Sequence, residues 1–250
     1  GSHARIIAKI ETKAATENIE EIVEEADMVM VARGDLAIET MPESVPIVQR
    51  QIVGLGLKHA TPTIVATQML ASMTEMPEPT RAEVSDIATA VIIGADCVML
   101  SDETAAGKYP IQAVEIMKRV ILHVQQNNPL SVSFETGKDR EDLTRQRAIS
   151  NAVINLANDI EATAIVAETL SGDTALQIVA HRPDVPVIVV TSNQVTVQQL
   201  SLVYGTKNYN RPVDPFAATK LTNWLQTSKV LKKGDVIVTV SGKYAGVVGT

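Results

Sequence analysis

The chain has few of the features that mark secreted, membrane-spanning or nucleic-acid-binding proteins. Cys97 is its single cysteine, so no disulfide can form within the chain. No apolar run reaches the roughly 18 residues of a membrane-spanning helix, and no signal-peptide pattern is present. The net charge is −7 and there is no Lys/Arg cluster, which gives no reason to expect nucleic acid or an anionic membrane as a partner. We therefore expect a soluble protein of the reducing cytoplasm.

What the chain does contain is enough apolar sequence for a substantial core. At 250 residues and 45% hydrophobic content, it is long enough for about two domains. Residues 1–4 are interpreted as a tag remnant, because Gly1-Ser2-His3 resembles a cleavage scar. These residues are left out of the fold prediction.

The first half of the sequence repeats one pattern four times. Apolar runs typical of buried strands lie near residues 5–10, 28–33, 62–67 and 96–101, and each is followed by a helical pattern. Helices are expected near residues 18–26, 44–60, 80–93 and 110–126. Thr80 to Glu83 forms a capping-box pattern at the start of the third helix. Near-continuous apolar strands of this kind are typical of parallel sheets covered by helices, which places the fold in the α/β class.

A second unit follows a change of composition. Around residues 127–142 the sequence becomes rich in polar and charged residues and loses its apolar periodicity. We therefore assign residues 5–128 to the first domain, 129–142 to a linker and 143–250 to the second. A helix near 143–157 and strands near 164–167, 187–190 and 236–240 predict a smaller three-layer α/β domain.

Charged side chains follow the first two predicted strands. Lys9 and Glu11 end the first strand, and Asp35 comes directly after the second. Because parallel strands present their C-terminal ends at one edge of the sheet, these side chains should lie together where α/β enzymes keep their chemistry. One lysine and two carboxylates in one place indicate a divalent metal site with a lysine ammonium beside it. Taken alone, the Lys9 and Glu11 pair is more often a solvated ion pair.

Five motifs in order resemble the pyruvate kinase family, and the resemblance covers nearly the whole chain. The motifs are IIAKIE (residues 6–11), MVARGDL (30–36), ATQML (66–70), PTRAE (79–83) and GADCVMLS (94–101). The second unit, with TLSGDT (169–174), resembles the C-terminal domain of that family. The resemblance implies the second half of a (β/α)8 barrel, built from four βα units, followed by the smaller α/β domain.

The resemblance also implies an activity and a role for each matching residue. Pyruvate kinases transfer a phosphoryl group between phosphoenolpyruvate and ADP in glycolysis, giving pyruvate and ATP. Glu11 and Asp35 would bind Mg²⁺ or Mn²⁺. Lys9 would stabilise charge on the phosphoryl group and the enolate. The backbone of Ala32, Arg33 and Gly34 would hold the substrate carboxylate. Thr67 would bind the substrate and help to deliver a proton. Ser101 is a weaker candidate for a proton relay.

The family resemblance further suggests an effector loop. Thr169, Ser171, Gly172 and Thr174 lie between a strand and a helix that Thr174 could cap, a geometry that exposes backbone N–H groups to a phosphorylated effector. Asp173 departs from the family, because many effector-responsive members carry Lys or Arg there and a carboxylate repels phosphate. Effector binding and a purely structural turn are both open at this position.

The chain matches the family from the fifth barrel strand onward. The strands before it carry the family's K⁺ site, most nucleotide contacts and the lid, so we expect little or no turnover from this chain alone. Open sheet edges favour self-association into a homo-oligomer. Two other hypotheses remain at this stage: a metal-dependent aldolase or lyase of the phosphoenolpyruvate/pyruvate barrel superfamily, and a non-catalytic regulatory or oligomerisation fragment.

Overall fold

The computed structural model describes residues 4–127 and 145–241. The chain divides into two compact units, residues 4–137 and residues 138–250 with 1–3, and each is described here by itself. The predicted linker, 129–142, and the first three residues of the predicted tag remnant lie outside the described residues.

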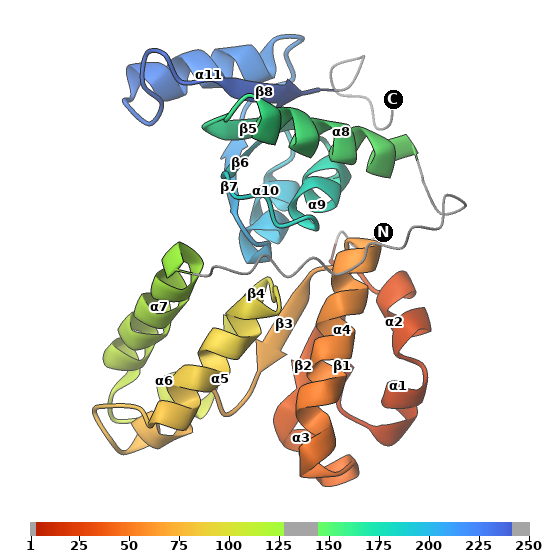
Figure 1. Ribbon diagram of the computed structural model, residues 1–250, viewed down its shortest axis with the longest axis vertical. Coiled ribbons are helices and arrows are strands. Elements are labelled where there is room, and N and C mark those ends of the chain that lie inside the picture. The colour runs from red at the N-terminus through yellow and green to blue at the C-terminus, as the bar shows by residue number, and fades with distance from the viewer. Residues whose placement is uncertain (1–3, 128–144, 242–250) are drawn as a thin grey trace. The chain divides into compact units, whose positions relative to one another are not determined.

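The first unit is built on one parallel sheet with the strand order β1-β2-β3-β4 (Figure 1). Its strands are β1 (Ile7–Ile10), β2 (Met28–Ala32), β3 (Thr63–Ala66) and β4 (Cys97–Met99). The four apolar runs therefore form strands in the predicted order. In the register, Lys9 pairs with Met30, and Met30 with Ile64. All four strands consequently end at the same edge of the sheet.

Helices follow every strand of the first unit. They are α1 (Lys13–Glu17) and α2 (Ile19–Glu25) after β1; α3 (Arg33–Glu39), the short 3-10 turn η1 (Pro42–Ser44) and α4 (Val45–His59) after β2; η2 (Ala71–Thr74) and α5 (Arg81–Ile92) after β3; and α6 (Asp102–Ala105) and α7 (Pro110–Asn127) after β4. The predicted capping box is present at α5. The Thr80 hydroxyl accepts from the Glu83 N–H, and the Glu83 carboxylate accepts from the Thr80 N–H.

The two faces of this sheet differ in how many apolar side chains they bury. The face under the helices carries the main core, in which Val29, Val31 and Val65 are fully buried against the helices. The opposite face holds a small cluster of Met28, Ile64 and Ala66, with Met30, Cys97 and Met99 packed beside it. Lys9 shares this second face, because its register partners Met30 and Ile64 belong to that cluster.

The second unit has three layers, as predicted. Its parallel sheet has the order β7-β6-β5-β8, with β5 (Ala164–Glu168), β6 (Val187–Thr191), β7 (Thr206–Asn210) and β8 (Ile237–Val240). Apolar residues of α8 (Arg145–Asp159) and α9 (Asp173–Val179) form one core with one face of the sheet. Those of α11 (Ala217–Thr227) form a second core with the other face. The short segments α10 (Gln194–Gln199) and η4 (Leu200–Leu202) connect β6 to β7.

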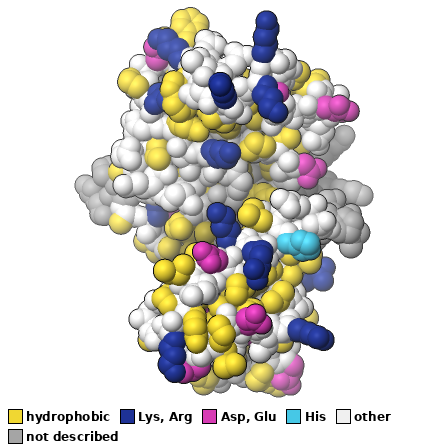
Figure 2. Space-filling view, turned by 90° about the vertical axis from the view of Figure 1, so that its left-hand side faces the viewer, with side chains coloured by type: hydrophobic (Ala, Val, Ile, Leu, Met, Phe, Trp, Pro, Cys, Tyr) yellow, Lys and Arg dark blue, Asp and Glu magenta, His cyan; other side chains and the backbone are white. Residues whose placement is uncertain are grey.

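Among the described residues, none of the helices combines the length and apolar character needed to cross a membrane. Exposed hydrophobic side chains nevertheless occur along α7, including Ile111, Val114 and Leu122. Figure 2 views the molecule from the side on which α7 lies in Figure 1, and it shows hydrophobic side chains interspersed with charged ones.

Candidate active site

The end of β1 brings a lysine against a carboxylate. Lys9 Nζ lies 2.5 Å from Glu11 Oε2, and the two side chains are 52% and 31% exposed. The pairing with the Glu11 carboxylate and its charge, with a smaller contribution from the charge of Asp35, raises the pKa of Lys9. The ammonium group therefore stays charged at neutral pH. Asp35 reaches the same region from the first turn of α3.

The Glu11 carboxylate has an oxygen that fits a metal ligand. Glu11 Oε2 is buried, and its ion-pair partner among the described residues is the Lys9 ammonium, 2.5 Å away. Buried carboxylate oxygens are normally paired with donors or with metal ions. Together with the exposed carboxylate of Asp35, it supplies the oxygen ligands that Mg²⁺ and Mn²⁺ prefer. The residues present therefore fit a hard divalent cation, which would supply a positive charge for developing oxyanions.

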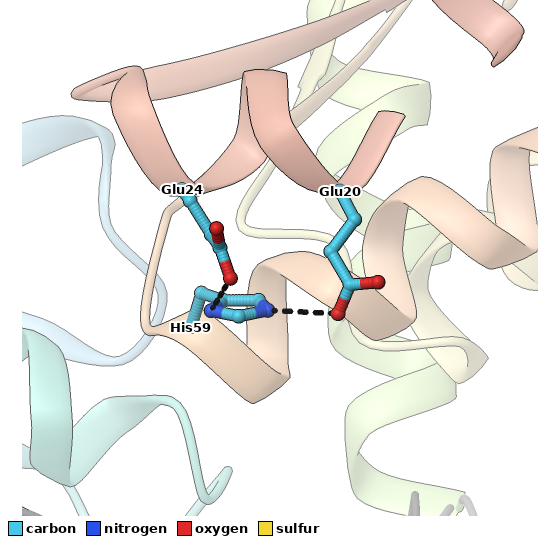
Figure 3. Close-up of side chains that lie close together, drawn as sticks. All are labelled: Glu20, Glu24 and His59. Atoms are coloured by element: carbon cyan, nitrogen blue, oxygen red, sulfur yellow. Dashed lines mark ion pairs between the residues drawn. The ribbon is translucent and has the colours of Figure 1, made fainter. Parts of the chain in front are cut away.

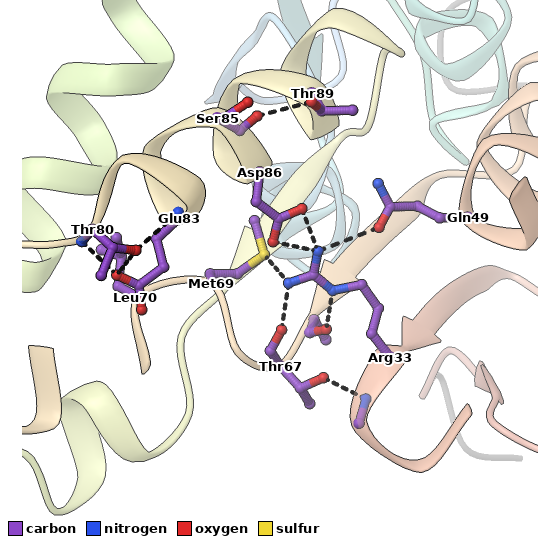
Figure 4. A network of polar contacts seen from close by, with 12 residues as sticks. Arg33, Gln49, Thr67, Met69, Leu70, Thr80, Glu83, Ser85, Asp86 and Thr89 are labelled. Atoms are coloured by element: carbon purple, nitrogen blue, oxygen red, sulfur yellow. Dashed lines mark hydrogen bonds and ion pairs between the residues drawn. The ribbon is translucent and has the colours of Figure 1, made fainter. Parts of the chain in front are cut away.

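Arg33 points into the protein and is 8% exposed (Figure 4). Its Nη1 donates to both carboxylate oxygens of Asp86, at 2.7 and 2.6 Å. Its Nε donates to the Ala66 carbonyl at 3.2 Å, and its Nη2 donates to the Thr67 carbonyl at 2.5 Å. One guanidinium thus ties the end of β2 to the loop after β3 and to α5. The Arg33 side chain therefore has a structural role in the site, and the Arg33 backbone remains the proposed substrate contact.

The loop after β3 has a constrained backbone. Thr67 and Gln68 have φ values of 68° and 54°, in the left-handed region that residues other than glycine rarely adopt. A β-branched residue such as Thr67 is held there only when its surroundings fix it. The Arg33 side chain fixes its carbonyl, and the Gly34 N–H donates to Thr67 Oγ1 at 2.9 Å. Thr67 is consequently oriented beside the Ala32 to Gly34 segment.

A buried carboxylate organises the end of β4. Glu103 is 2% exposed and accepts from the Leu70 N–H at 3.0 Å and from the Ser101 N–H at 2.8 Å. It therefore joins the loop after β3 to the loop after β4. Ser101 lies half-buried at the start of α6, where this contact fixes its backbone.

Sequence reasoning missed the side chains that hold these loops. Arg33 contacts Asp86 across 53 positions of the chain, and Glu103 contacts Leu70 across 33. No local periodicity links residues so far apart. The available signal was the occurrence of each acidic residue within an otherwise helical, half-buried segment, which is too common to identify a partner.

The predicted effector loop lies between β5 and α9. The Thr169 hydroxyl accepts from the Gly172 N–H at 3.0 Å, and Gly172 has a φ of 100°. The Ser171 hydroxyl donates to the Asp173 carboxylate at 2.8 Å. The prediction that Thr174 caps the helix was wrong, because α9 begins at Asp173 with Gly172 as its N-cap. The left-handed turn at Gly172 starts the helix two residues earlier than a cap at Thr174 would.

Comparison with known proteins gives a consistent assignment for both units. The family model described as "Pyruvate kinase, barrel domain" matches residues 1–114, and "Pyruvate kinase, alpha/beta domain" matches residues 147–250. Pyruvate kinase from Geobacillus stearothermophilus is 38% identical over 252 residues, covering 99% of this chain and 43% of that protein. Pyruvate kinase from Thermotoga maritima is 40% identical over 260 residues, covering 100% of this chain and 53% of that protein.

A solved structure agrees with these relatives. The crystal structure of a pyruvate kinase from Cryptosporidium parvum superposes with a TM-score of 0.91 at 30% identity, covering 98% of this chain and 51% of that one. The chain therefore spans about half the length of the relatives it matches.

Proposed function

Because this chain belongs to the pyruvate kinase family, we propose that it contributes the metal and phosphoryl-transfer side of a site that interconverts phosphoenolpyruvate and ADP with pyruvate and ATP. The observation that carries this proposal is the Lys9 ammonium beside Glu11, with Asp35 close enough to influence it. A cation and two carboxylates at the carboxyl ends of parallel strands suit transfer of a phosphoryl group. Glycolysis and a cytoplasmic location follow from this proposal.

The residues of the chain divide the work as follows. Glu11 and Asp35 hold Mg²⁺ or Mn²⁺, which supplies charge stabilisation for phosphate and enolate oxygens when bound. Lys9 carries a fixed positive charge to the transferring phosphoryl group. The backbone of Ala32, Arg33 and Gly34 binds the substrate carboxylate.

Proton delivery belongs to the loops after β3 and β4. Thr67 contacts the substrate and helps to deliver a proton to the enolate carbon. Its hydroxyl is oriented by the Gly34 N–H, so the proton donor and the carboxylate cradle are held together. Ser101 extends the relay from the next strand.

The chain by itself should turn over slowly. The Lys9 side chain is 52% exposed, so water reaches the reacting position from the described side of the site. Phosphoryl transfer depends on positioning and on excluding competing water. We therefore propose that the 250-residue chain binds metal and substrate weakly.

A coupled phosphoenolpyruvate/ADP assay, run beside a Mn²⁺-dependent phosphoenolpyruvate binding titration, tests the proposal. We expect Mn²⁺-dependent binding, with Lys9→Met weakening it on the order of tenfold or more because a charge-assisted contact to phosphate is lost. Lys13→Met, an exposed lysine of α1, is the matched control and should have no effect. Phosphoenolpyruvate binding that ignores both Mn²⁺ and Lys9 would favour the non-catalytic fragment instead. The aldolase or lyase hypothesis loses its basis once both units match the pyruvate kinase family.

We also propose a weak site for a phosphorylated effector at Thr169, Ser171, Gly172 and Thr174. The Asp173 carboxylate, which accepts from the Ser171 hydroxyl, opposes phosphate there. Asp173→Lys should therefore strengthen binding of a sugar bisphosphate in a fluorescence titration. Unchanged binding would leave the loop as a structural turn.

We further propose that the chain forms a homo-oligomer. Ile111, Val114 and Leu122 of α7 are exposed hydrophobic side chains that association would cover. Sedimentation velocity across a concentration series should detect it, and a Val114→Lys variant should shift the distribution toward the monomer.

A further inference from the structure

Two helices outside the candidate active site bring three metal-ligand side chains together (Figure 3). Glu20 and Glu24 lie four residues apart on α2 and therefore share a helix face. His59 is the last residue of α4. One ligand atom from each residue can be chosen so that all three lie within 4.8 Å of one another. We propose that Glu20, Glu24 and His59 form a binding site for a divalent transition-metal ion such as Zn²⁺.

The two glutamates flank opposite nitrogens of the imidazole, at distances longer than good hydrogen bonds. His59 Nε2 lies 3.5 Å from Glu20 Oε1, and His59 Nδ1 lies 3.6 Å from Glu24 Oε1. Good N–H to O hydrogen bonds are nearer to about 2.9 Å. Two ligands of a tetrahedral Zn²⁺ with bonds of about 2.0–2.1 Å are roughly 3.3 Å apart. Small rotations of the two exposed glutamates would bring both carboxylates to one imidazole nitrogen.

The imidazole is held with only a long contact at one nitrogen. His59 Nε2 is shielded from solvent and forms no well-aligned hydrogen bond among the described residues, its neighbour being Glu20 Oε1 at 3.5 Å. The side chain is 20% exposed, whereas Glu20 and Glu24 are 53% and 52% exposed. The nitrogen is therefore held in place, and the carboxylates leave a path for an ion and for the water molecules that would complete its coordination.

The surrounding structure fixes the position of His59 relative to α2. The Thr61 hydroxyl, two residues after the helix, donates to the Val23 carbonyl of α2 at 2.9 Å. Ala60 ends α4 in the left-handed conformation, with a φ of 57°. Ile19 and Val23 of α2 are buried in the same core as Leu57 of α4. Preorganisation of this kind lowers the cost of gathering ligands around an ion.

The chemistry of the set selects the ion. Imidazole nitrogen suits Zn²⁺, Cu²⁺ and Ni²⁺, whereas Mg²⁺ prefers oxygen ligands alone. The cluster should therefore discriminate against the metal proposed for Glu11 and Asp35. Lys58 is a competitor, because its Nζ lies 2.6 Å from Glu20 Oε1. That pair is largely exposed, and exposed ion pairs are weak enough for a divalent ion to displace.

Zn²⁺ titration by calorimetry tests the site. The titrated protein is the full chain carrying His3→Ala, Glu11→Gln and Asp35→Asn, which removes the terminal histidine and the proposed magnesium ligands. We expect one Zn²⁺ per chain. His59→Ala and Glu24→Gln should each weaken binding on the order of tenfold or more. Lys58→Met should tighten it, a change that a purely structural role for the cluster would not produce.

The controls separate this site from general surface binding. Glu21→Gln changes an exposed residue of α2 that is not part of the cluster. His123→Ala removes a histidine of α7 outside the cluster. Both should bind Zn²⁺ within about twofold of the parent. Zn²⁺ should also raise the melting temperature of the parent more than that of Glu24→Gln. Absence of binding, or equal binding by the His59→Ala and His123→Ala variants, would overturn the proposal. Neither result bears on Mg²⁺ at Glu11 and Asp35, which these variants lack.

Discussion

Individual residues of this chain owe their reactivity to where the fold places them. Cys97 lies on β4 beside the small apolar cluster of the first unit. Burial, followed by the negative charge of Asp96, raises the pKa of its thiol to about 11. The thiolate is the reactive form, so Cys97 should be an inert residue in the folded chain.

Thiol labelling checks this assignment. At about pH 8 the folded chain should react with a thiol reagent on the order of a hundredfold more slowly than the urea-unfolded chain, because little thiolate is present. Equal rates in the two states would show that Cys97 is neither buried nor shifted.

His181 gives the second unit a pH-dependent stability. Burial, and then the positive charge of Arg147, lower the pKa of this imidazole below its ordinary value. The unfolded chain therefore takes up a proton more readily than the folded chain. The contribution of His181 to the free energy of unfolding has its full value above about pH 6.5. It falls as the pH drops below that value toward the pKa of the folded chain.

Urea unfolding at about pH 7.5 and pH 5.5 measures this effect. We expect the free energy of unfolding to fall over this interval, and His181→Gln to reduce the fall. His123→Gln, at an exposed helical position, serves as the control and should leave it unchanged. An identical pH dependence in the parent and in His181→Gln would show that the imidazole is not responsible.

At the scale of the elements, α4 packs closely against the start of β3 at Gly56. A Cβ at Gly56 would lie 2.4 Å from the Thr63 methyl group and 2.7 Å from the Thr61 carbonyl oxygen. Gly56→Ala should therefore lower the free energy of unfolding by about 1–3 kcal/mol. Thr63→Ser removes the nearer atom, so the double variant should recover part of that loss. Full stability of Gly56→Ala in a urea titration would show that helix and strand are further apart.

The Arg33 and Asp86 pair connects three elements at the candidate site. The Arg33 side chain is 9% exposed and that of Asp86 34%, so removing one charge leaves the other partly buried. Asp86→Asn should cost on the order of 2–4 kcal/mol, near the lower part of the range for broken buried pairs. Glu75→Gln breaks the exposed pair with Lys108 and should cost less than about 1 kcal/mol. Equal costs in the two variants would contradict a supporting role for Arg33.

The sequence predicted elements where the local pattern is strong. The strands of the first unit are apolar runs, and the α5 capping box is a local signal, so both were found. β7 was not predicted, because TKNYN has no apolar run and lies at the sheet edge with β6 as its strand neighbour. The short helix α3, directly after β2, was not predicted either. The contacts that Arg33 makes at its start depend on residues far away in the sequence, such as Asp86.

At the scale of the whole molecule, each unit has its own core. The first unit has one large apolar cluster and one small one, and the second unit has one cluster on each face of its sheet. Chains with separate cores often depart from two-state unfolding. Scanning calorimetry should give a calorimetric enthalpy above the van't Hoff enthalpy, with Gly56→Ala shifting only part of the transition. One transition with equal enthalpies, shifted as a whole, would contradict separate unfolding.

The central claim is that Glu11 and Asp35 hold a hard divalent metal ion beside Lys9. The most direct test is a calorimetric Mn²⁺ titration of the parent chain, of Glu11→Gln and of Asp35→Asn, with Glu39→Gln as the exposed acidic control from α3. We predict one Mn²⁺ site that each of the first two variants weakens on the order of tenfold or more and that the control leaves intact. Mn²⁺ binding that is the same in all four proteins would contradict the claim.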